Sequence, residues 1–187
     1  MQVLSINTAR VEHFVATNGE RLASAIRKRP RDGRIAVGPL GLAGDEQADP
    51  SVHGGLSKAV YAYPQEHYAV WVAMRQQAQV DGELPPGSLG ENLTISGLLE
   101  TRVWIGDVLR FPDCELVVSE PRQPCFKLAA HLGFAHAVKM MAQSGYCGFY
   151  LAVKREGTIA AGEAFELLPG PREVGIAELF KAKMRRK

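Results

Sequence analysis

The sequence of 187 residues has no long apolar run, few cysteines and almost no net charge. No stretch approaches the roughly 20 apolar residues of a membrane-spanning helix. The start, MQVLSINTAR, lacks the basic and apolar regions of a signal peptide. A formal charge of +2 is too small for a general nucleic-acid binder. These absences predict a soluble, cytoplasmic protein whose partners include neither a membrane nor a nucleic acid.

The three cysteines are Cys114, Cys125 and Cys147. An odd number at wide spacing excludes a disulfide framework, and no CxxC pair is present to hold structural zinc. No GxGxxG motif follows a strand, so the sequence offers no flavin or nicotinamide fingerprint. Each cysteine therefore has to be judged by its own neighbours.

The periodicity predicts a β-rich α/β fold in one domain over residues 1–169, followed by a short C-terminal helix and a basic tail over 170–187. Turn signals separate many short strands, which favours an antiparallel sheet closing toward a barrel or a sandwich. The segment 10–33 is expected to form a loop or an exposed edge. The expected elements are strands at 3–8, 34–37, 58–63, 92–96, 103–105, 108–111, 115–119, 147–154 and 164–168, and helices starting at Pro64 and spanning 126–143 and 174–183.

A glycine-punctuated stretch, GLAGDEQADPSVHGG, runs from Gly41 to Gly55. Its composition excludes a regular element, and loops this long in compact domains usually serve function. His53, Gly54 and Gly55 close it, and the two glycines permit close approach of the backbone to a ligand. The alternative is a tight turn with a surface histidine. Asn92 lies where the later stretch Gly90–Gly97 enters a strand, and its side chain could likewise contact a ligand or simply cap the backbone.

The stretch Ser119–Lys127, SEPRQPCFK, carries the strongest chemical signal. Pro124 suits the first helical position, which would put Cys125 in the first turn of a helix. The helix dipole, together with Arg122 and Lys127, would then favour the thiolate, which is both a nucleophile and a soft-metal ligand. The alternative is a buried cysteine that acts as a small hydrophobic group. A hydrolase would need a histidine base, for which His53 and His131 are available.

Four motifs in order resemble one known family. They are GLAGDEQAD…HGG…KAVYAYPQEHY, GENLTISGL, GDVLRF and SEPRQPCFKL, and the resemblance covers about residues 40–168. The family is the MOSC domain (the molybdenum cofactor sulfurase C-terminal domain), and the likeness is greatest to its stand-alone, YiiM-type members. Longer members continue into a C-terminal helical bundle, of which this sequence has only the helix near 174–183.

The resemblance implies a MOSC-type β-barrel with a few peripheral helices that binds the molybdenum cofactor (molybdopterin), a pterin dithiolene with a phosphate. Cys125 would be the ligand of molybdenum, and a soft thiolate suits a metal already bound by dithiolene sulfurs. By motif position, Lys58, Arg122 and Lys127 would bind the phosphate. The residues implied to line the pterin are Ser119, His53, Gly54 and Asn92.

The activity that the resemblance implies is two-electron reduction of N-hydroxylated small molecules, such as hydroxylaminopurines, hydroxylamines or amidoximes, to the amine. His53 or Asp45 would donate a proton, and an external electron-transfer protein, a reductase or a ferredoxin-like carrier, would supply electrons. One alternative is a sulfur carrier that holds a persulfide on Cys125. Another is a metal-free cysteine hydrolase or thiol redox protein. A monomer and a homodimer are both compatible with the sequence.

Overall fold

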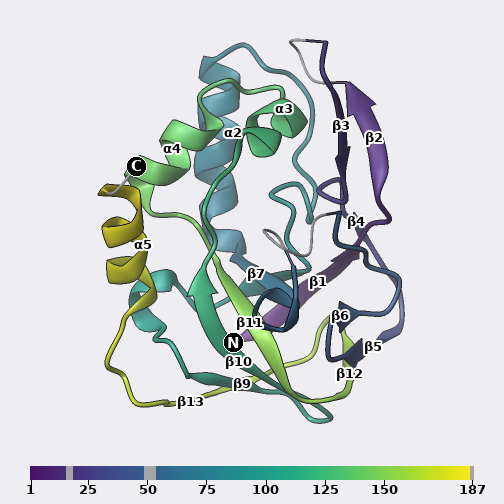
Figure 1. Ribbon diagram of the computed structural model, residues 1–187, viewed down its shortest axis with the longest axis vertical. Coiled ribbons are helices and arrows are strands. Elements are labelled where there is room, and N and C mark those ends of the chain that lie inside the picture. Colours follow the sequence, from purple (N-terminus) through teal and green to yellow (C-terminus); the bar gives the residue numbers. More distant parts are fainter. Residues whose placement is uncertain (16–18, 49–53, 186–187) are drawn as a thin grey trace.

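The computed structural model describes residues 1–15, 19–48 and 54–185, which form a β-rich fold with short helices gathered at one end (Figure 1). The strands are β1 (Gln2–Thr8), β2 (Glu12–Val15), β3 (Arg21–Ser24), β4 (Arg29–Pro30), β5 (Arg34–Gly38), β6 (Gly41–Leu42), β7 (Val60–Pro64), β8 (Leu93–Ser96), β9 (Val108–Arg110), β10 (Glu115–Pro121), β11 (Phe149–Arg155), β12 (Gly157–Ala160) and β13 (Glu166–Leu168). The helices are α2 (Tyr68–Gln77), α3 (Phe126–Leu132), α4 (Ala137–Ser144) and α5 (Ile176–Arg185), with 3-10 turns η1 (Leu56–Lys58), η2 (Gln65–His67) and η3 (Glu100–Arg102).

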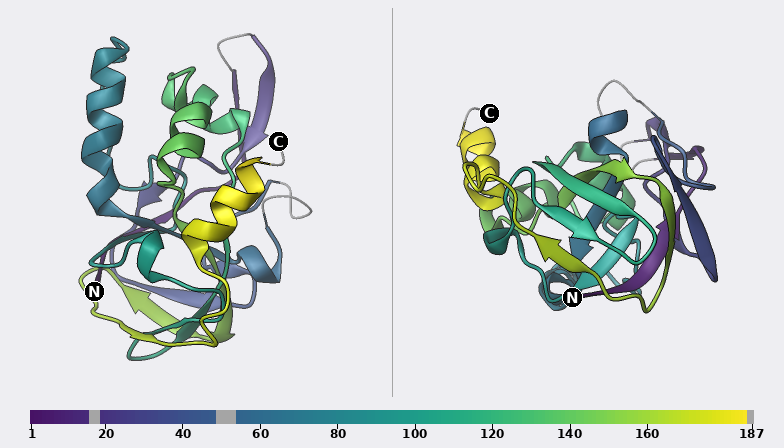
Figure 2. Two further views of the ribbon diagram at one scale, coloured as in Figure 1. Left: turned by 90° about the vertical axis from the view of Figure 1, so that its left-hand side faces the viewer. Right: turned by 90° about the horizontal axis from the view of Figure 1, so that it is seen from below.

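Eight strands form the main sheet in the order β13-β9-β10-β11-β7-β8-β1-β4. All neighbours in it are antiparallel except β7 and β8, which are parallel. A second sheet has the order β12-β5-β6, and β2 pairs only with β3. The strands curl around a common interior, as the right-hand view of Figure 2, seen from below, shows. This arrangement confirms a β-rich fold with few helices.

The prediction of a closed barrel is wrong, because the order of the main sheet is open, with β13 and β4 at its two ends. The segment before β13 does approach β1: Gly162 N–H donates to Val3 O at 2.8 Å and Val3 N–H donates to Glu163 O at 2.9 Å. These contacts amount to one isolated bridge between Gln2 and Ala164. Gly162 lies in a turn with φ +88°, so the chain there cannot extend into a continuous ladder.

Two hydrophobic cores lie on the two sides of the central strands. The first is enclosed by the sheets and includes Val3, Ile6, Leu109 and Phe149. The second lies between the sheet and the helices, where Trp71 of α2, Leu128 of α3 and Phe180 of α5 are fully buried. Because β7 and β11 contribute side chains to both cores, they are the rigid wall on which a site can be built.

The helix predicted over 126–143 is two helices, α3 and α4. Gly133 has φ +60° and ends α3 in the left-handed conformation, with its N–H bonded to Ala129 O. The helix expected to begin at Pro64 instead begins at Tyr68, because Pro64 still belongs to β7 and η2 follows it. Among the described residues no helix is long and apolar enough to cross a membrane.

Two segments also differ from the predicted pattern near the N-terminus and in the middle of the chain. The segment 10–33, expected as a loop or an exposed edge, contains the paired strands β2 and β3 and the exposed edge strand β4. Phe14 and Leu22 give the β2–β3 pair a small core against Ile26 and Ala130. The strand expected at 103–105 is only a bridge from Trp104 to Gly175. The β2–β3 pair matters for the site because it brings the chain after β3 next to α3.

Candidate functional site

One pocket, enclosing about 650 Å³ with its open mouth included, lies where the segment after β3, the loop after β6, η1 and the start of α3 meet. Strands β7 and β11 form its floor with Tyr61 and Tyr150. Four basic residues, one cysteine and one asparagine line it: Lys28, Lys58, Arg122, Lys127, Cys125 and Asn92. Sites for anions are built from cations collected in this way.

Cys125 is the only one of the three cysteines that lines this pocket. It is the N-cap residue of α3, with extended backbone (φ −128°, ψ 166°), and its carbonyl accepts the Leu128 N–H at 3.0 Å. The prediction that it lies inside the first helical turn is therefore wrong by one position. Its side chain is half-buried, whereas Cys114 and Cys147 are fully buried. Burial raises the pKa of the Cys114 thiol to about 12 and that of Cys147 well above the ordinary thiol value.

Arg122 is a buried cation beneath the pocket, only 5% exposed. Its guanidinium lies 5.2 Å from the centroid of the Tyr61 ring, a cation–π distance, and its Nη1 lies 3.6 Å from Met141 Sδ. Burial raises the pKa of both Tyr61 and Tyr150, so these phenols are neutral at pH 7. Burial also opposes the charge on Arg122, but the nearby Tyr61, Tyr150 and Cys125 groups outweigh it and raise its pKa. Arg122 therefore remains a fixed positive charge beside Cys125.

Lys28 and Asp45 form a buried ion pair in the wall of the pocket. The ammonium of Lys28 lies 2.5 and 2.7 Å from the two Asp45 oxygens, and the side chains are only 8% and 7% exposed. Burial lowers the pKa of Lys28, and Asp45 counteracts that effect. The same carboxylate accepts bonds from Asn92 Nδ2 and from Ala9 N–H, each at 2.8 Å. Asp45 thus links the glycine-rich loop to three separate parts of the chain.

Asn92 and Gly90 also line the pocket, next to this ion pair. Asn92 Oδ1 accepts the Tyr61 N–H at 3.0 Å, and Asn92 Nδ2 also donates to Asn7 O at 3.2 Å. Gly90 has φ +82°, and a Cβ there would lie 2.9 Å from Ile26 Cγ1. Glycine adopts this positive φ without strain and has no Cβ to collide with Ile26. The backbone of Gly90 therefore reaches the pocket surface directly.

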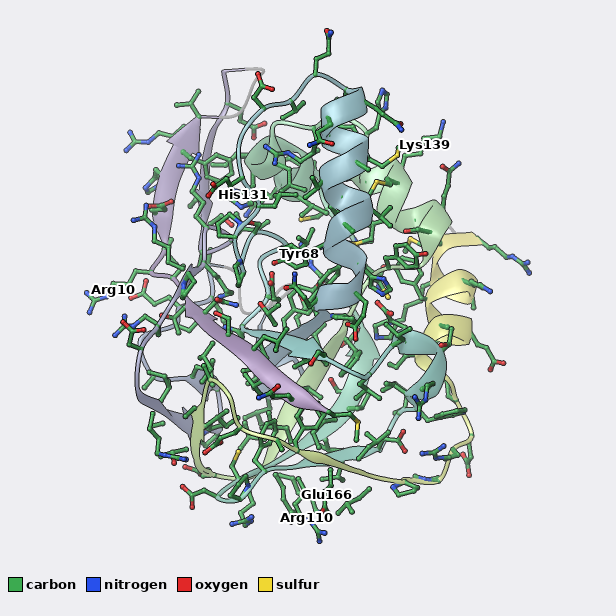
Figure 3. All side chains as sticks on the ribbon, turned by 180° about the vertical axis from the view of Figure 1, so that it is seen from behind. Arg10, Tyr68, Arg110, His131, Lys139 and Glu166 are labelled. Carbon is green, nitrogen blue, oxygen red and sulfur yellow. The ribbon has the colours of Figure 1, made fainter. Side chains whose placement is uncertain are left out.

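The turn that carries Gly90 is organised by the fully buried Glu91. Its carboxylate accepts bonds from Gly87 N–H at 2.8 Å, Leu89 N–H at 3.0 Å and Thr94 Oγ1 at 2.8 Å, and from the hydroxyl of Tyr68, which lies in the interior in Figure 3. Burial raises the pKa of Glu91. The carboxylate satisfies the backbone of a turn that would otherwise leave buried N–H groups unpaired.

Lys58 and Lys127 complete the basic lining. Lys58 lies 3.8 Å from Glu120 Oε1 and 5.9 Å from the centroid of the Tyr150 ring. Glu120 is shared, since its other oxygen is 3.1 Å from the ammonium of Lys183 in α5. Lys127 donates to Ala23 O at 2.9 Å, which ties α3 to β3. The basic groups are thus held by specific contacts.

Of the residues predicted for the site, Lys58, Asn92, Arg122, Cys125 and Lys127 all line the one pocket. Asp45, named above as a proton-donor candidate, lines it as well, whereas Ser119 and Gly54 do not. Ser119 donates its hydroxyl to Ser57 O, and Gly54 is buried. His53 lies outside the described residues, so its role stays a prediction.

His131, one of the two histidines available for a hydrolase, is not among the residues that line this pocket. It lies on α3 (Figure 3), its Nδ1 is buried without a hydrogen-bond partner among the described residues, and burial lowers its pKa to about 4. The structure therefore does not pair Cys125 with His131 as nucleophile and base.

Sequence reasoning missed Lys28, Tyr61 and Tyr150. Lys28 belongs to the run Arg27-Lys28-Arg29, in which nothing marks one basic residue as buried. In the structure both arginine neighbours are exposed, but three basic residues in a row give no sign of that difference in the sequence. The two tyrosines look like ordinary strand residues, and only the tertiary fold brings them under Arg122.

Comparison with known proteins agrees with this arrangement. YflK of Bacillus subtilis is 40% identical over 178 residues, covering 95% of this chain and 77% of that protein. YiiM of Escherichia coli is 37% identical over 155 residues, covering 83% of this chain and 68% of that protein. A Gibberella moniliformis protein named "Reductase" is 36% identical over 177 residues, and the match spans only 29% of its length.

Solved structures show the same fold. The crystal structure of YiiM from Geobacillus stearothermophilus superposes with a TM-score of 0.78 at 30% identity, covering 99% of this chain and 84% of that one. YiiM from Escherichia coli gives a TM-score of 0.70 at 29% identity, covering 94% of this chain and 78% of that one. The family model for the MOSC domain matches residues 49–166, which include Cys125 and most of the pocket floor. The chain therefore belongs to the MOSC domain family.

Proposed function

We propose that this protein binds the molybdenum cofactor in the pocket described above and reduces N-hydroxylated compounds to amines, with Cys125 as the protein ligand of the metal. The observation that carries the proposal is the combination of one half-buried thiol with four basic side chains and two buried tyrosine rings in a single pocket. The relative named "Reductase" supports a reductive activity, although the chain covers less than a third of it.

The single thiol in the pocket, that of Cys125, suits a metal whose other ligands belong to a cofactor. A thiolate is a soft ligand and suits molybdenum already held by dithiolene sulfurs. Cys125 is the cysteine with an accessible thiol in this pocket, and the fixed charge of Arg122 beside it favours the anionic form of a ligand. Cys114 and Cys147 are buried and unsuited to the same task.

The rest of the lining fits a flat anion. Lys58, Lys127 and Arg122 supply the positive charge that a pterin phosphate needs, whereas the charge of Lys28 is compensated by Asp45. The rings of Tyr61 and Tyr150 offer flat apolar surface, and the Gly90 backbone leaves room for close approach. When bound, the cofactor would supply the two-electron chemistry that takes oxygen from an N–OH group.

The overall reaction is R–NHOH with two electrons and two protons giving R–NH₂ and water. The N–O bond breaks, the nitrogen is reduced, and an external donor is oxidised. The chain's own residues hold the cofactor, neutralise its phosphate and shield the site from water. Asp45 accepts hydrogen bonds from Lys28, Asn92 and Ala9, so the role we give it is structural. His53 stays our prediction for the proton donor.

The experiment is to express the protein in a host that makes the cofactor and to measure molybdenum per chain and pterin fluorescence after oxidation. The same preparation is assayed for reduction of an N-hydroxylated purine by dithionite-reduced methyl viologen. We expect near-stoichiometric molybdenum and turnover in the wild type. Cys125→Ser should fold normally and lose turnover, because an alcohol is a poor soft-metal ligand.

Cys114→Ser is the matched control, since it makes the same atomic change outside the pocket. It should keep the wild-type molybdenum content and turnover per folded molecule. Full activity in Cys125→Ser would contradict the ligand assignment. A wild-type protein that lacks molybdenum and carries a persulfide on Cys125 would instead support the sulfur-carrier alternative.

A further inference from the structure

The N-terminal segment is rich in arginines that do not line the pocket. Residues 10–34 contain seven basic and three acidic residues, a net +4, while the whole chain is only +2. Lys28 is buried against Asp45, but the six arginines are all exposed. These exposed residues are Arg10, Arg21, Arg27, Arg29, Arg31 and Arg34.

Three of these arginines, Arg10, Arg29 and Arg31, are attached to the wall of the pocket through their backbone. Arg10 lies between Ala9 and Val11, whose N–H groups donate to the Asp45 and Glu46 carboxylates at 2.8 and 2.7 Å. Both carboxylates line the pocket.

Arg29 follows Lys28, another lining residue, and pairs with Thr8 of β1. Arg31 donates its N–H to Ile6 O at 2.8 Å, and its guanidinium approaches Gly44, which precedes Asp45. All three side chains are exposed, on segments whose backbone is joined to the wall of the candidate site. We call Arg10, Arg29 and Arg31 the arginine face.

The arginine face keeps its charge uncompensated by ion pairs within the described part of the chain. No ion pair of Arg10, Arg29 or Arg31 occurs among the described residues, in contrast to Arg27 and Arg34, which lie near Glu12 and Glu163. Figure 3 shows Arg10 projecting outward at the edge of the molecule. Exposed like charges placed close together repel one another and raise the potential at the surface. A cluster of this kind is suited to steer an anionic partner.

The proposed reaction requires such a partner, because it consumes two electrons and the sequence offers no GxGxxG fingerprint of a flavin or nicotinamide site. We propose that the arginine face docks an acidic electron-transfer protein beside the pocket; this rests on the proposed function. A protein donor has to bring its redox centre close to the site and then leave. Exposed charges give fast, salt-sensitive association of that transient kind.

The test compares two triple variants with the wild type. Arg10→Gln/Arg29→Gln/Arg31→Gln removes the arginine face. Arg102→Gln/Arg110→Gln/Lys139→Gln removes the same number of charges from exposed positions elsewhere, and Arg110 and Lys139 lie far from Arg10 in Figure 3. The two variants have equal net charge, so a difference between them reports position.

Turnover of the molybdenum-loaded protein is measured with two donors. One is an acidic [2Fe–2S] ferredoxin reduced by its NADPH-dependent reductase, and the other is dithionite-reduced methyl viologen, a small cation. We expect the arginine-face variant to raise the KM for ferredoxin about tenfold at low ionic strength. Added salt should bring wild type and variant together, because screening acts over about 10 Å at 0.1 M. Turnover with viologen should not change.

Equal KM values for ferredoxin in the wild type and the arginine-face variant would overturn the docking proposal. So would an equal rise in both triple variants, or a wild type that turns over with viologen but not with ferredoxin. A molybdenum-loaded wild type that is inactive with viologen as well would refute the proposed reductase, and the docking proposal would fall with it.

Discussion

Lys28 and Asp45, 17 residues apart in the sequence, form a charge pair that is more than nine-tenths buried in the wall of the candidate site. The pair joins the strand edge to the glycine-rich loop, and through Asn92 it also reaches the turn before β8. A buried pair of this kind adds little stability compared with apolar residues, but breaking it is costly.

Asp45→Asn should destabilise the fold by about 3 kcal/mol, because it leaves the Lys28 charge buried without its partner. Burial holds the folded pKa of Lys28 below 10.5, and the loss of Asp45 lowers it further. The folded state then gives up its proton before the unfolded state does. The free energy of unfolding of Asp45→Asn should therefore recover as pH rises through that window toward 10.5.

Urea unfolding of Asp45→Asn between pH 7 and pH 10 measures this recovery. The double variant Lys28→Met/Asp45→Asn is the control, since it removes both charges and should be nearly pH-independent relative to wild type. A single variant as stable as the wild type at pH 7 would show that the pair is not buried in solution.

Thiol labelling should distinguish the three cysteines. We expect the native protein without cofactor to react with one equivalent of an aromatic disulfide reagent at pH 8. Cys114 and Cys147 are fully buried, and burial raises the pKa of both. Cys125→Ser should react with none until it is unfolded, when two thiols appear. Rapid labelling of two thiols in the folded wild type would contradict this assignment.

Gly90→Ala should destabilise the protein and narrow the pocket. Gly33→Ala is the matched control, because Gly33 has nearly the same positive φ, +79° against +82°, but open space around it. The difference between them isolates the contact of the new Cβ with Ile26, which we expect to cost at least about 1 kcal/mol. Thermal or urea unfolding gives the free energies. Equal values for both variants would mean that Ile26 moves aside freely.

His131 should make the fold less stable in mild acid. Its folded pKa of about 4 lies below the ordinary value of 6.5. Between pH 6.5 and pH 4 the imidazole is therefore protonated in the unfolded chain and neutral in the folded chain. Stability is therefore lost as pH falls from 6.5 toward 4, by up to about 1 kcal/mol per unit. His131→Gln should flatten this slope in urea unfolding at pH 7 and pH 5. His136→Gln, at an exposed position of the neighbouring segment, should not.

Much of this site could be predicted from the sequence because its motifs are local. Cys125 with its basic neighbours Arg122 and Lys127 lies within six residues, and the glycine loop and Asn92 are short, recognisable stretches. Lys58, Asn92 and Lys127 then meet in the pocket because the strands around them are short and strongly paired.

The remaining features depend on tertiary contacts that no local pattern reports. Lys28 is buried only because Asp45 lies opposite it, and its two arginine neighbours look the same in the sequence. The helix predicted through Gly133 was interrupted because a left-handed glycine outweighed a continuous apolar pattern. The barrel was expected from short, closely spaced strands with turn signals and from the family resemblance, whereas closure depends on how far the last strand pairs with β1.

Glu120 joins the last helix to the pocket, since its two oxygens face Lys58 and Lys183. An anion that binds in the pocket competes with Glu120 for Lys58 and leaves more of that carboxylate to Lys183. A stronger contact between Lys183 and Glu120 in turn weakens the contact between Glu120 and Lys58, and the anion then binds Lys58 with less competition. Anion affinity and the docking of α5 are therefore thermodynamically coupled, and by linkage each must change the other by the same factor.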